Sequence, residues 1–92
     1  MTLVLIKAFY TSIARPLTYK AIIATEETRG VEITGVEKAE KIINLIYSLI
    51  DAKECKTVEY TPDILGYTIK IDCTRQAVTK IQETVIKTLS KR

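Results

Sequence analysis

Apolar residues in the first third of the chain occur in short runs that predict β-strands. Residues 3–10 are apolar or aromatic except for Lys7, and β-branched and aromatic types are frequent among them. Such a run is typical of a strand that is covered on most of both faces. Pro16 ends the pattern because it cannot donate a backbone hydrogen bond. Residues 18–25 predict a second strand and residues 31–33 a short third one.

Helical periodicity begins after Thr34. Thr34 and Glu37 have the spacing of a capping box, in which each side chain binds the backbone amide of the other residue. They predict a helix from about residue 35 to residue 52. The apolar residues of this helix spread over roughly 180° of its circumference, against about 100° for a helix that covers one core face. We expect one stripe of them to face the sheet: Ala39, Ile43, Ile46 and Ile50.

A second apolar stripe lies beside the first on the same helix. Ile42, Leu45 and Leu49 are separated by three and four residues, so they are neighbours on the helix surface. Because the other stripe already faces the sheet, we expect a second protein chain to cover this one. These three residues are therefore the predicted interface.

The second half of the chain predicts a hairpin and a second helix. Residues 56–60 and 67–72 flank a segment from Pro62 to Gly66 that is typical of a turn. A last helix is expected over residues 74–91, with five apolar residues inward: Ala77, Val78, Ile81, Val85 and Leu89. This order of elements predicts an α+β two-layer sandwich, a small antiparallel sheet with two long helices on one face. Its uncovered sheet edges also favour a dimer.

Composition excludes several kinds of chemistry. The chain has 92 residues and a net charge of +3, which predicts a single domain over residues 1–92. It has two cysteines and no histidine, so a four-ligand zinc site and a His-dependent triad are excluded. The carboxylates of Asp51, Asp63 and Asp72 have no recognisable acid–base partner. We expect no catalytic residue, no metal and no cofactor.

The two cysteines are expected to be separate buried thiols. The hairpin register that brings the apolar residues onto one face puts Cys55 and Cys73 on opposite faces. The alternative register sets the cysteines opposite each other but also sets Glu59 beside Ile69. The hydrophobic pattern therefore favours the first register and reduced cysteines.

The N-terminal pattern and the amide content bear on the cellular setting. The four apolar residues before Lys7 are too few for a signal peptide or a membrane span, so we expect a cytoplasmic protein without membrane contacts. Asn occurs once, at Asn44, and Gln twice, at Gln76 and Gln82. Such scarcity of labile amides is typical of heat-adapted proteins and indicates an archaeal-like thermophile, in which intracellular disulfides are less rare.

A basic stripe on the last helix is the candidate contact for nucleic acid. Lys80, Lys87 and Lys91 fall within a sector of about 40° at 100° per residue, and Arg92 lies beyond them. Such a stripe follows a phosphate backbone in some proteins. The favoured interpretation is that these lysines are solvated and complement the helix dipole, because a net charge of +3 is modest for a nucleic-acid-binding domain.

Tyrosines on the predicted strands have two interpretations. Tyr60 and Tyr67 lie near the hairpin turn, and Tyr10 and Tyr19 lie on the N-terminal strands. Aromatic residues on a sheet can stack nucleic-acid bases. We favour cross-strand pairs and interface anchors, because no adjacent Gly-rich or Arg-flanked RNA motif accompanies these residues.

Three pieces of the chain carry a resemblance to a known family: VEITGVEKAEKIINLIYSLI, then YTIKIDCT at the end of the hairpin, then RQAVTKIQETVIKTL. In this order they resemble the Pcc family, the small dimerisation subunits of the KEOPS complex. The resemblance covers about 59 of the 92 residues and is one of pattern. The family's last helix usually carries Arg and, four residues later, Asn or Ser after its Ala-Leu, whereas Thr79 and Glu83 follow Ala77-Val78 here. The leading strands are also longer, so the chain resembles a divergent paralogue.

The resemblance implies a non-catalytic subunit that pairs with a related chain, binds the catalytic KEOPS subunit and helps to hold tRNA. That complex makes threonylcarbamoyl-adenosine next to the anticodon. We therefore expect a dimerising or scaffold subunit of a larger complex, as a homodimer or a heterodimer, with KEOPS as the candidate complex. A small nucleic-acid-binding module that uses the basic stripe is the alternative. A small dimeric enzyme such as a nuclease is the second alternative.

Overall fold

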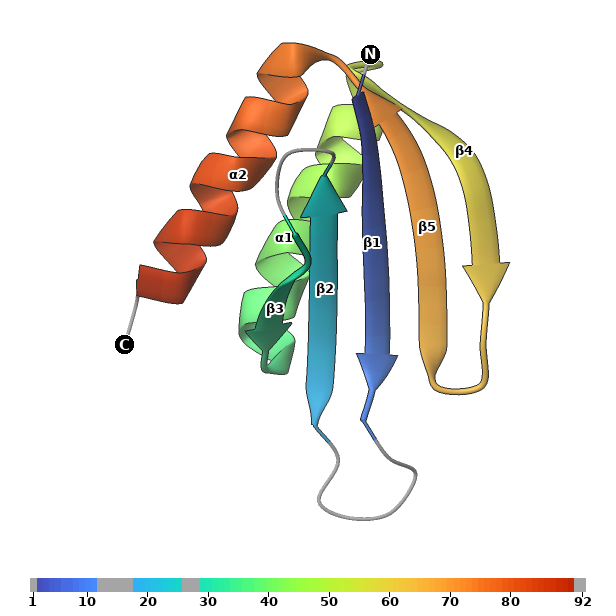
Figure 1. Ribbon diagram of the computed structural model, residues 1–92, viewed down its shortest axis with the longest axis vertical. Helices are drawn as coiled ribbons and strands as arrows, with labels where there is room; N and C mark the ends of the chain where they lie inside the picture. The colour runs from blue at the N-terminus through green and yellow to red at the C-terminus, as the bar shows by residue number, and fades with distance from the viewer. Residues whose placement is uncertain (1, 12–17, 26–28, 91–92) are drawn as a thin grey trace.

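The computed structural model describes residues 2–11, 18–25 and 29–90 (Figure 1). Its helices and strands lie where the hydrophobic pattern predicts them, in the following order: β1 (Thr2–Tyr10), β2 (Tyr19–Thr25), β3 (Val31–Thr34), α1 (Val36–Asp51), β4 (Cys55–Pro62), β5 (Gly66–Cys73) and α2 (Arg75–Ser90). The strands form one sheet in the order β3-β2-β1-β5-β4, and every neighbouring pair is antiparallel. The predicted α+β fold is confirmed.

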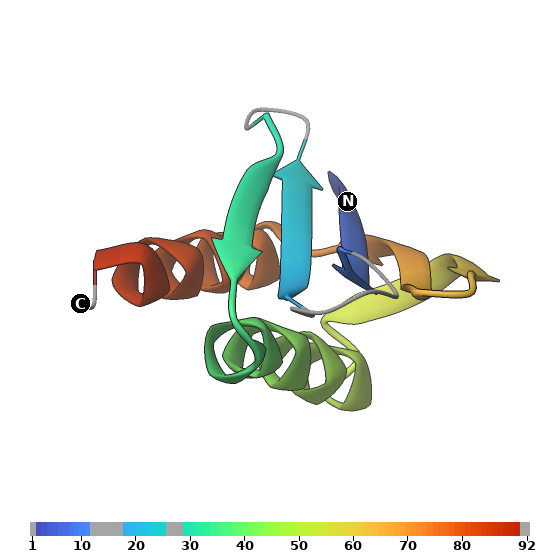
Figure 2. The ribbon, with the colours of Figure 1, turned by 90° about the horizontal axis from the view of Figure 1, so that it is seen from below.

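The two helices pack on one face of the sheet, and β1 is its central strand (Figure 2). Alternate residues of β1 therefore have different surroundings. Val4, Ile6 and Ala8 face the helices and are at most 1% exposed. Leu3 and Leu5 point to the other face and are 44% and 40% exposed. The prediction that this strand is covered on most of both faces is wrong, because both helices lie on the same side.

Helix α1 has the predicted extent but buries a different stripe. Its buried residues are Ala39, Ile42, Ile46 and Leu49. Ile43 and Ile50, which were expected to face the sheet, are half-buried.

The predicted interface stripe is therefore corrected. Ile42 is 0% and Leu49 is 3% exposed, so neither is available to a second chain. Leu45 is half-buried and packs against the same core. The reason is that α2 packs against α1, so the wide apolar arc is covered by two partners within the chain, the sheet and α2.

The predicted capping box is absent at the start of α1. Thr34 is the last residue of β3 and lies opposite Lys20. The N-cap is Gly35, and it makes no side-chain cap hydrogen bond. Gly35 has a φ of 106°, which favours glycine, and its N–H donates to the Tyr19 carbonyl over 2.8 Å. Pairing in the sheet thus holds Thr34 in a strand, and a glycine makes the turn into the helix.

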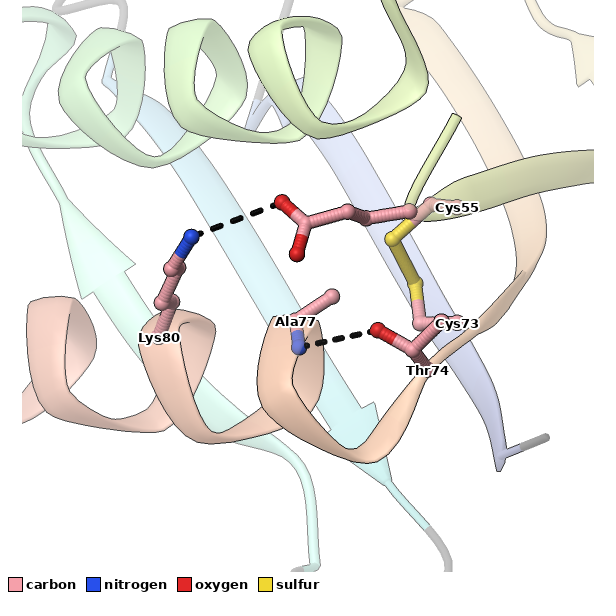
Figure 3. The surroundings of a disulfide bond; sticks show 6 residues. Cys55, Cys73, Thr74, Ala77 and Lys80 are labelled. Atoms are coloured by element: carbon pink, nitrogen blue, oxygen red, sulfur yellow. Dashed lines mark hydrogen bonds and ion pairs between the residues drawn. A yellow bond between two sulfur atoms is a disulfide. The ribbon is translucent and has the colours of Figure 1, made fainter. Parts of the chain in front are cut away.

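The hairpin contains a disulfide, so the prediction of separate thiols is wrong. Cys55 lies opposite Cys73, and the two form a disulfide between the start of β4 and the end of β5 (Figure 3). A β-bulge between Thr57 and Glu59 then shifts the register by one residue, so Glu59 lies opposite Lys70 and not Ile69. The bulge lets the cysteines meet while the rest of β4 keeps its charged residue away from the core.

Helix α2 follows the disulfide directly. The Thr74 hydroxyl accepts a hydrogen bond from the Ala77 N–H over 3.2 Å and caps the helix (Figure 3). Ala77, Val78, Ile81 and Val85 are buried as predicted. At the C-terminal end Thr88 is buried, whereas Leu89, which was expected inward, is 50% exposed.

Candidate interaction surfaces

The face of the sheet that the helices leave uncovered, here called the open face, has an apolar centre. Leu3 and Leu5 of β1 are exposed large apolar side chains at this centre. Ala24 lies opposite Leu5, and Ile22 lies opposite Lys7, so both belong to the same face and are half-buried. Exposed aliphatic residues that are contiguous on the central strands are typical of a binding surface.

Charged side chains of both signs surround this apolar centre. Lys20 forms an ion pair with Glu32 of β3. On the other side of β1, Lys70 of β5 forms an ion pair with Glu59 of β4, with 3.7 Å between Lys70 Nζ and Glu59 Oε2. These pairs are cross-strand neighbours whose mutual attraction is screened by water. Because each pair joins one positive and one negative side chain, the pairs give the open face no strong electrostatic potential of one sign.

Both sheet edges have features that oppose pairing with another strand. Edge strand β4 carries the bulge near Val58, and it ends at Pro62, which lacks a backbone donor. Edge strand β3 has only four residues and exposes Glu32. The edges, which the sequence suggested as a reason for dimerisation, are therefore less suited to association than the open face.

A groove with a volume of about 440 Å³ lies between α2 and the strands β2 and β3. Its lining is mostly aliphatic: Ile23, Thr25, Val31, Ile81, Gln82, Val85, Ile86 and Leu89. Ile86 is 63% exposed, so the rim of the groove is open to solvent. The groove contains no ionisable side chain among the described residues.

The basic stripe is only partly described. Lys80 forms an ion pair with Glu54, with 3.4 Å between Lys80 Nζ and Glu54 Oε2, and the pair lies beside the disulfide (Figure 3). Lys87 is exposed in the last turn of α2. Lys91 and Arg92 lie outside the described residues. The Glu54 carboxylate reduces the positive potential that Lys80 would contribute to a phosphate contact.

The tyrosines form pairs on the helix side of the sheet. Tyr10 lies opposite Tyr19, and their ring centroids are 4.9 Å apart in an edge-to-face arrangement. The rings of Tyr60 and Tyr67 are 5.7 Å apart. The prediction of cross-strand pairs is confirmed.

Sequence reasoning missed the fifth tyrosine, Tyr47 of α1. The Tyr67 hydroxyl is within hydrogen-bonding reach of Tyr47 and Tyr19. The sequence does contain one indication of its place: Tyr47 lies one helical turn after the apolar Ile43, so the two residues share one side of the helix. We call the five residues the tyrosine surface: Tyr10, Tyr19, Tyr47, Tyr60 and Tyr67.

Burial raises the pKa of two tyrosines of this surface. For Tyr67 burial is the main cause, and the hydrogen bond with Tyr47 adds to it. For Tyr19 burial is again the main cause, and the Tyr10, Tyr47 and Glu40 side chains raise the pKa further. Both hydroxyl groups therefore keep their protons, and can act as hydrogen-bond donors, to a higher pH than an exposed tyrosine would.

The candidate acid–base residues lie in three different elements. Asp51 ends α1, Asp63 is in the hairpin turn and Asp72 is on β5 opposite Lys56. The Asp63 carboxylate accepts a hydrogen bond from the Ile64 N–H over 2.7 Å, which is a local turn contact. In residues 2–11, 18–25 and 29–90, no group of three or more metal-ligating side chains was found.

Comparison with protein-family models, curated proteins and solved structures found no match to this chain. Neither of the two described helices is long and apolar enough to cross a membrane.

Proposed function

We propose that the chain is a non-catalytic interaction module that pairs with a second copy of itself through the open face. The observation that supports this proposal is the exposure of Leu3 and Leu5, at 44% and 40%, in the central strand of the sheet. Two such faces can pack with their strand directions about 30° apart, as in β-sandwiches. The contact would be isologous, with the same residues on both copies.

The open face is large enough for a dimer. Its five strands, at about 4.8 Å spacing and about 25 Å length, cover roughly 600 Å². Two copies would bury roughly 1,200 Å² in total, which is the lower end of the range for stable interfaces. The paired charges Lys20–Glu32 and Lys70–Glu59 can lie at its rim without repelling a second copy.

Sedimentation over a dilution series tests the dimer. We expect the wild-type protein to be dimeric at micromolar concentration, and Leu5→Lys to be a monomer with an unchanged circular dichroism spectrum. The control is Ile64→Lys, because Ile64 is 93% exposed in the hairpin turn and should leave the dimer intact. A wild-type monomer at all concentrations, or a dimeric Leu5→Lys protein, would contradict the proposal.

The resemblance to the Pcc family supports a more specific proposal, that the dimer belongs to an assembly of the KEOPS type. There it would hold the catalytic subunit and tRNA and take no part in the reaction. Size-exclusion chromatography with a purified KEOPS catalytic subunit tests this step. Separate elution of the two proteins would refute the assembly and leave the dimer proposal standing.

We also propose that the protein is cytoplasmic in a heat-adapted cell. The low content of Asn and Gln supports this proposal. The Cys55–Cys73 disulfide is compatible with it, because intracellular proteins of hyperthermophiles are often rich in disulfides. Thiol alkylation in native lysate followed by mass spectrometry tests it: oxidised cysteines in the cytosolic fraction are expected.

A further inference from the structure

The tyrosine surface lies at the end of the sheet opposite the disulfide. At one end of β1, Thr2 lies opposite Cys73, and at the other end Tyr10 lies opposite Tyr19. Tyr67, the second residue of β5, lies opposite Ala8 near this second end. All five tyrosines of the chain therefore converge from four strands and one helix onto a single region.

The rings in this region are held in place and still accessible. Tyr47 is 51%, Tyr60 is 56% and Tyr10 is 42% exposed. Their half-buried neighbours Tyr19 and Tyr67 fix them through ring contacts and hydrogen bonds. Ordered, exposed tyrosines present rigid aromatic area at a low entropy cost, which is typical of recognition surfaces.

The charge beside these rings is negative on the helix. Glu40 and Asn44 are exposed, and their spacings of seven and three residues from Tyr47 place them on its side of α1, towards the end of the helix that follows β3. The Glu40 carboxylate is close enough to Tyr19 to act on it electrostatically. An incoming cation would thus meet both the aromatic rings and the Glu40 carboxylate.

The lysines of the described strands are all on the opposite side of the sheet. By their pairing with open-face residues, these are Lys7, Lys20, Lys56 and Lys70. Among the described residues, no lysine of a strand therefore lies on the same side of the sheet as the tyrosine surface. Because a carboxylate lies beside the rings and the strand lysines lie on the other face, the tyrosine surface favours a positively charged partner.

We propose that the tyrosine surface docks a basic segment of a partner protein, with arginine or lysine side chains lying over the rings of Tyr47 and Tyr60. The ring faces attract such cations, and each contact of this kind contributes about 0.5–2 kcal/mol depending on its desolvation. Glu40 receives a neighbouring cation of the same segment. The proposal concerns a different surface from the dimer contact, so either can fail alone.

A nucleic acid is the less suited occupant. Bases could stack on the same tyrosines, but the phosphate backbone would then lie near Glu40 with the strand lysines on the other face. A single-stranded oligonucleotide is therefore the competing ligand in the test.

The experiment uses the full chain and three probes: a short peptide with alternating Arg and Ser, the same peptide with Glu in place of Arg, and a single-stranded oligonucleotide. Binding is followed by NMR of the tyrosine ring resonances and by fluorescence anisotropy of labelled probes. We expect only the Arg peptide to bind and to shift the Tyr47 and Tyr60 rings. Tyr60→Ala should weaken this binding about tenfold, whereas Tyr60→Phe, which keeps the ring, should retain it.

Two controls separate this surface from the rest of the molecule. Leu5→Lys alters the open face and should leave peptide binding unchanged. Glu40→Gln should weaken binding and reduce its dependence on salt. The proposal is overturned if the Arg peptide does not bind at millimolar concentration, if Tyr60→Ala binds as well as wild type, or if the oligonucleotide shifts the tyrosine rings and the peptide does not.

Discussion

The two ends of the β4–β5 hairpin are held together by different interactions. At the disulfide end, Cys55 and Cys73 are 3% and 0% exposed and are joined covalently. At the other end, Tyr60 is 56% exposed and contacts Tyr67 through its ring. The disulfide end is a closed part of the core, whereas the tyrosine end presents ordered side chains to solvent.

This difference suggests a division of roles within one hairpin. The disulfide limits the freedom of the unfolded chain at one end, so the other end does not have to bury its aromatic residues for the fold to be stable. Recognition residues can then remain exposed at the tyrosine end. Each of the following experiments weakens one end and asks whether the other responds.

The largest expected effect comes from removing the disulfide. Cys55 and Cys73 are separated by 18 residues, and closing a loop of that size stabilises a fold by about 3 kcal/mol in the chain-entropy description. Cys55→Ala with Cys73→Ala should therefore lower Tm by on the order of 10–20 °C. Thermal unfolding monitored by circular dichroism measures the change.

The tyrosine end should respond little to the same double variant while the protein is folded. We expect the NMR resonances of the Tyr60 and Tyr67 rings to stay in place at low temperature. An unchanged Tm would show that the disulfide end owes its stability to packing alone. Displaced tyrosine resonances would show that the two ends are not independent.

Much of the fold could be predicted because it depends on periodicity. The strand at 18–25, the hairpin turn near Pro62 and the last helix all follow from the spacing of apolar residues. Where two apolar residues are adjacent in a strand, however, the sequence alone does not show which of them faces the core. Val4 and Leu5 have similar chemistry, and only the placement of both helices on one side separates them.

The disulfide and the surfaces depended on features that periodicity does not contain. A bulge near Val58 inserts one residue into β4, and simple alternation then gives the wrong partner for Cys55. The wide apolar arc of α1 suggested a partner chain at Leu49, but α2 is the element that covers it. The tyrosine pairs could be predicted from strand neighbours, whereas Tyr47 joins them through tertiary packing.

A second prediction concerns the tyrosine end, where Gly66 lets β5 approach β1 closely. A Cβ at this position would lie 1.9 Å from the Ala8 carbonyl oxygen and 2.6 Å from Phe9 Cα, both backbone atoms. Gly66→Ala should therefore destabilise the fold by about 1–3 kcal/mol through strand separation. Urea unfolding measures this loss.

Gly30→Ala is the matched control for this substitution. Its nearest neighbour is the side-chain Cγ2 of Ile22, at 3.1 Å, which can move. We expect a much smaller change there. Equal losses of stability for Gly30→Ala and Gly66→Ala would mean that the close approach of β1 and β5 does not determine the cost of a side chain at position 66.

A third and smaller effect is expected from the helix cap at the disulfide end. The Thr74 hydroxyl accepts the Ala77 N–H, so Thr74→Ala should cost about 1 kcal/mol. Thr34→Ala is the comparison, because Thr34 has the sequence spacing of a cap but lies in β3. If urea unfolding shows that Thr34→Ala is the more damaging of the two, the capping box at α1 would have to be reinstated.

The smallest effect appears only at alkaline pH and only at the tyrosine end. Burial raises the pKa of Tyr67, and its hydrogen bond with Tyr47 adds to the rise, so the folded protein keeps this proton when the unfolded chain loses it near pH 10. The stabilisation is complete below about pH 10 and is lost as pH rises towards the folded pKa. Urea midpoints between about pH 8 and pH 11 should therefore fall for the wild type and fall less for Tyr67→Phe.

Tyr60→Phe is the control, because Tyr60 is more than half exposed. If Tyr67→Phe and the wild type lose stability in parallel, the Tyr67 hydroxyl is more hydrated than its contacts with Tyr47 and Tyr19 imply. The tyrosine surface would then be held together by ring packing alone.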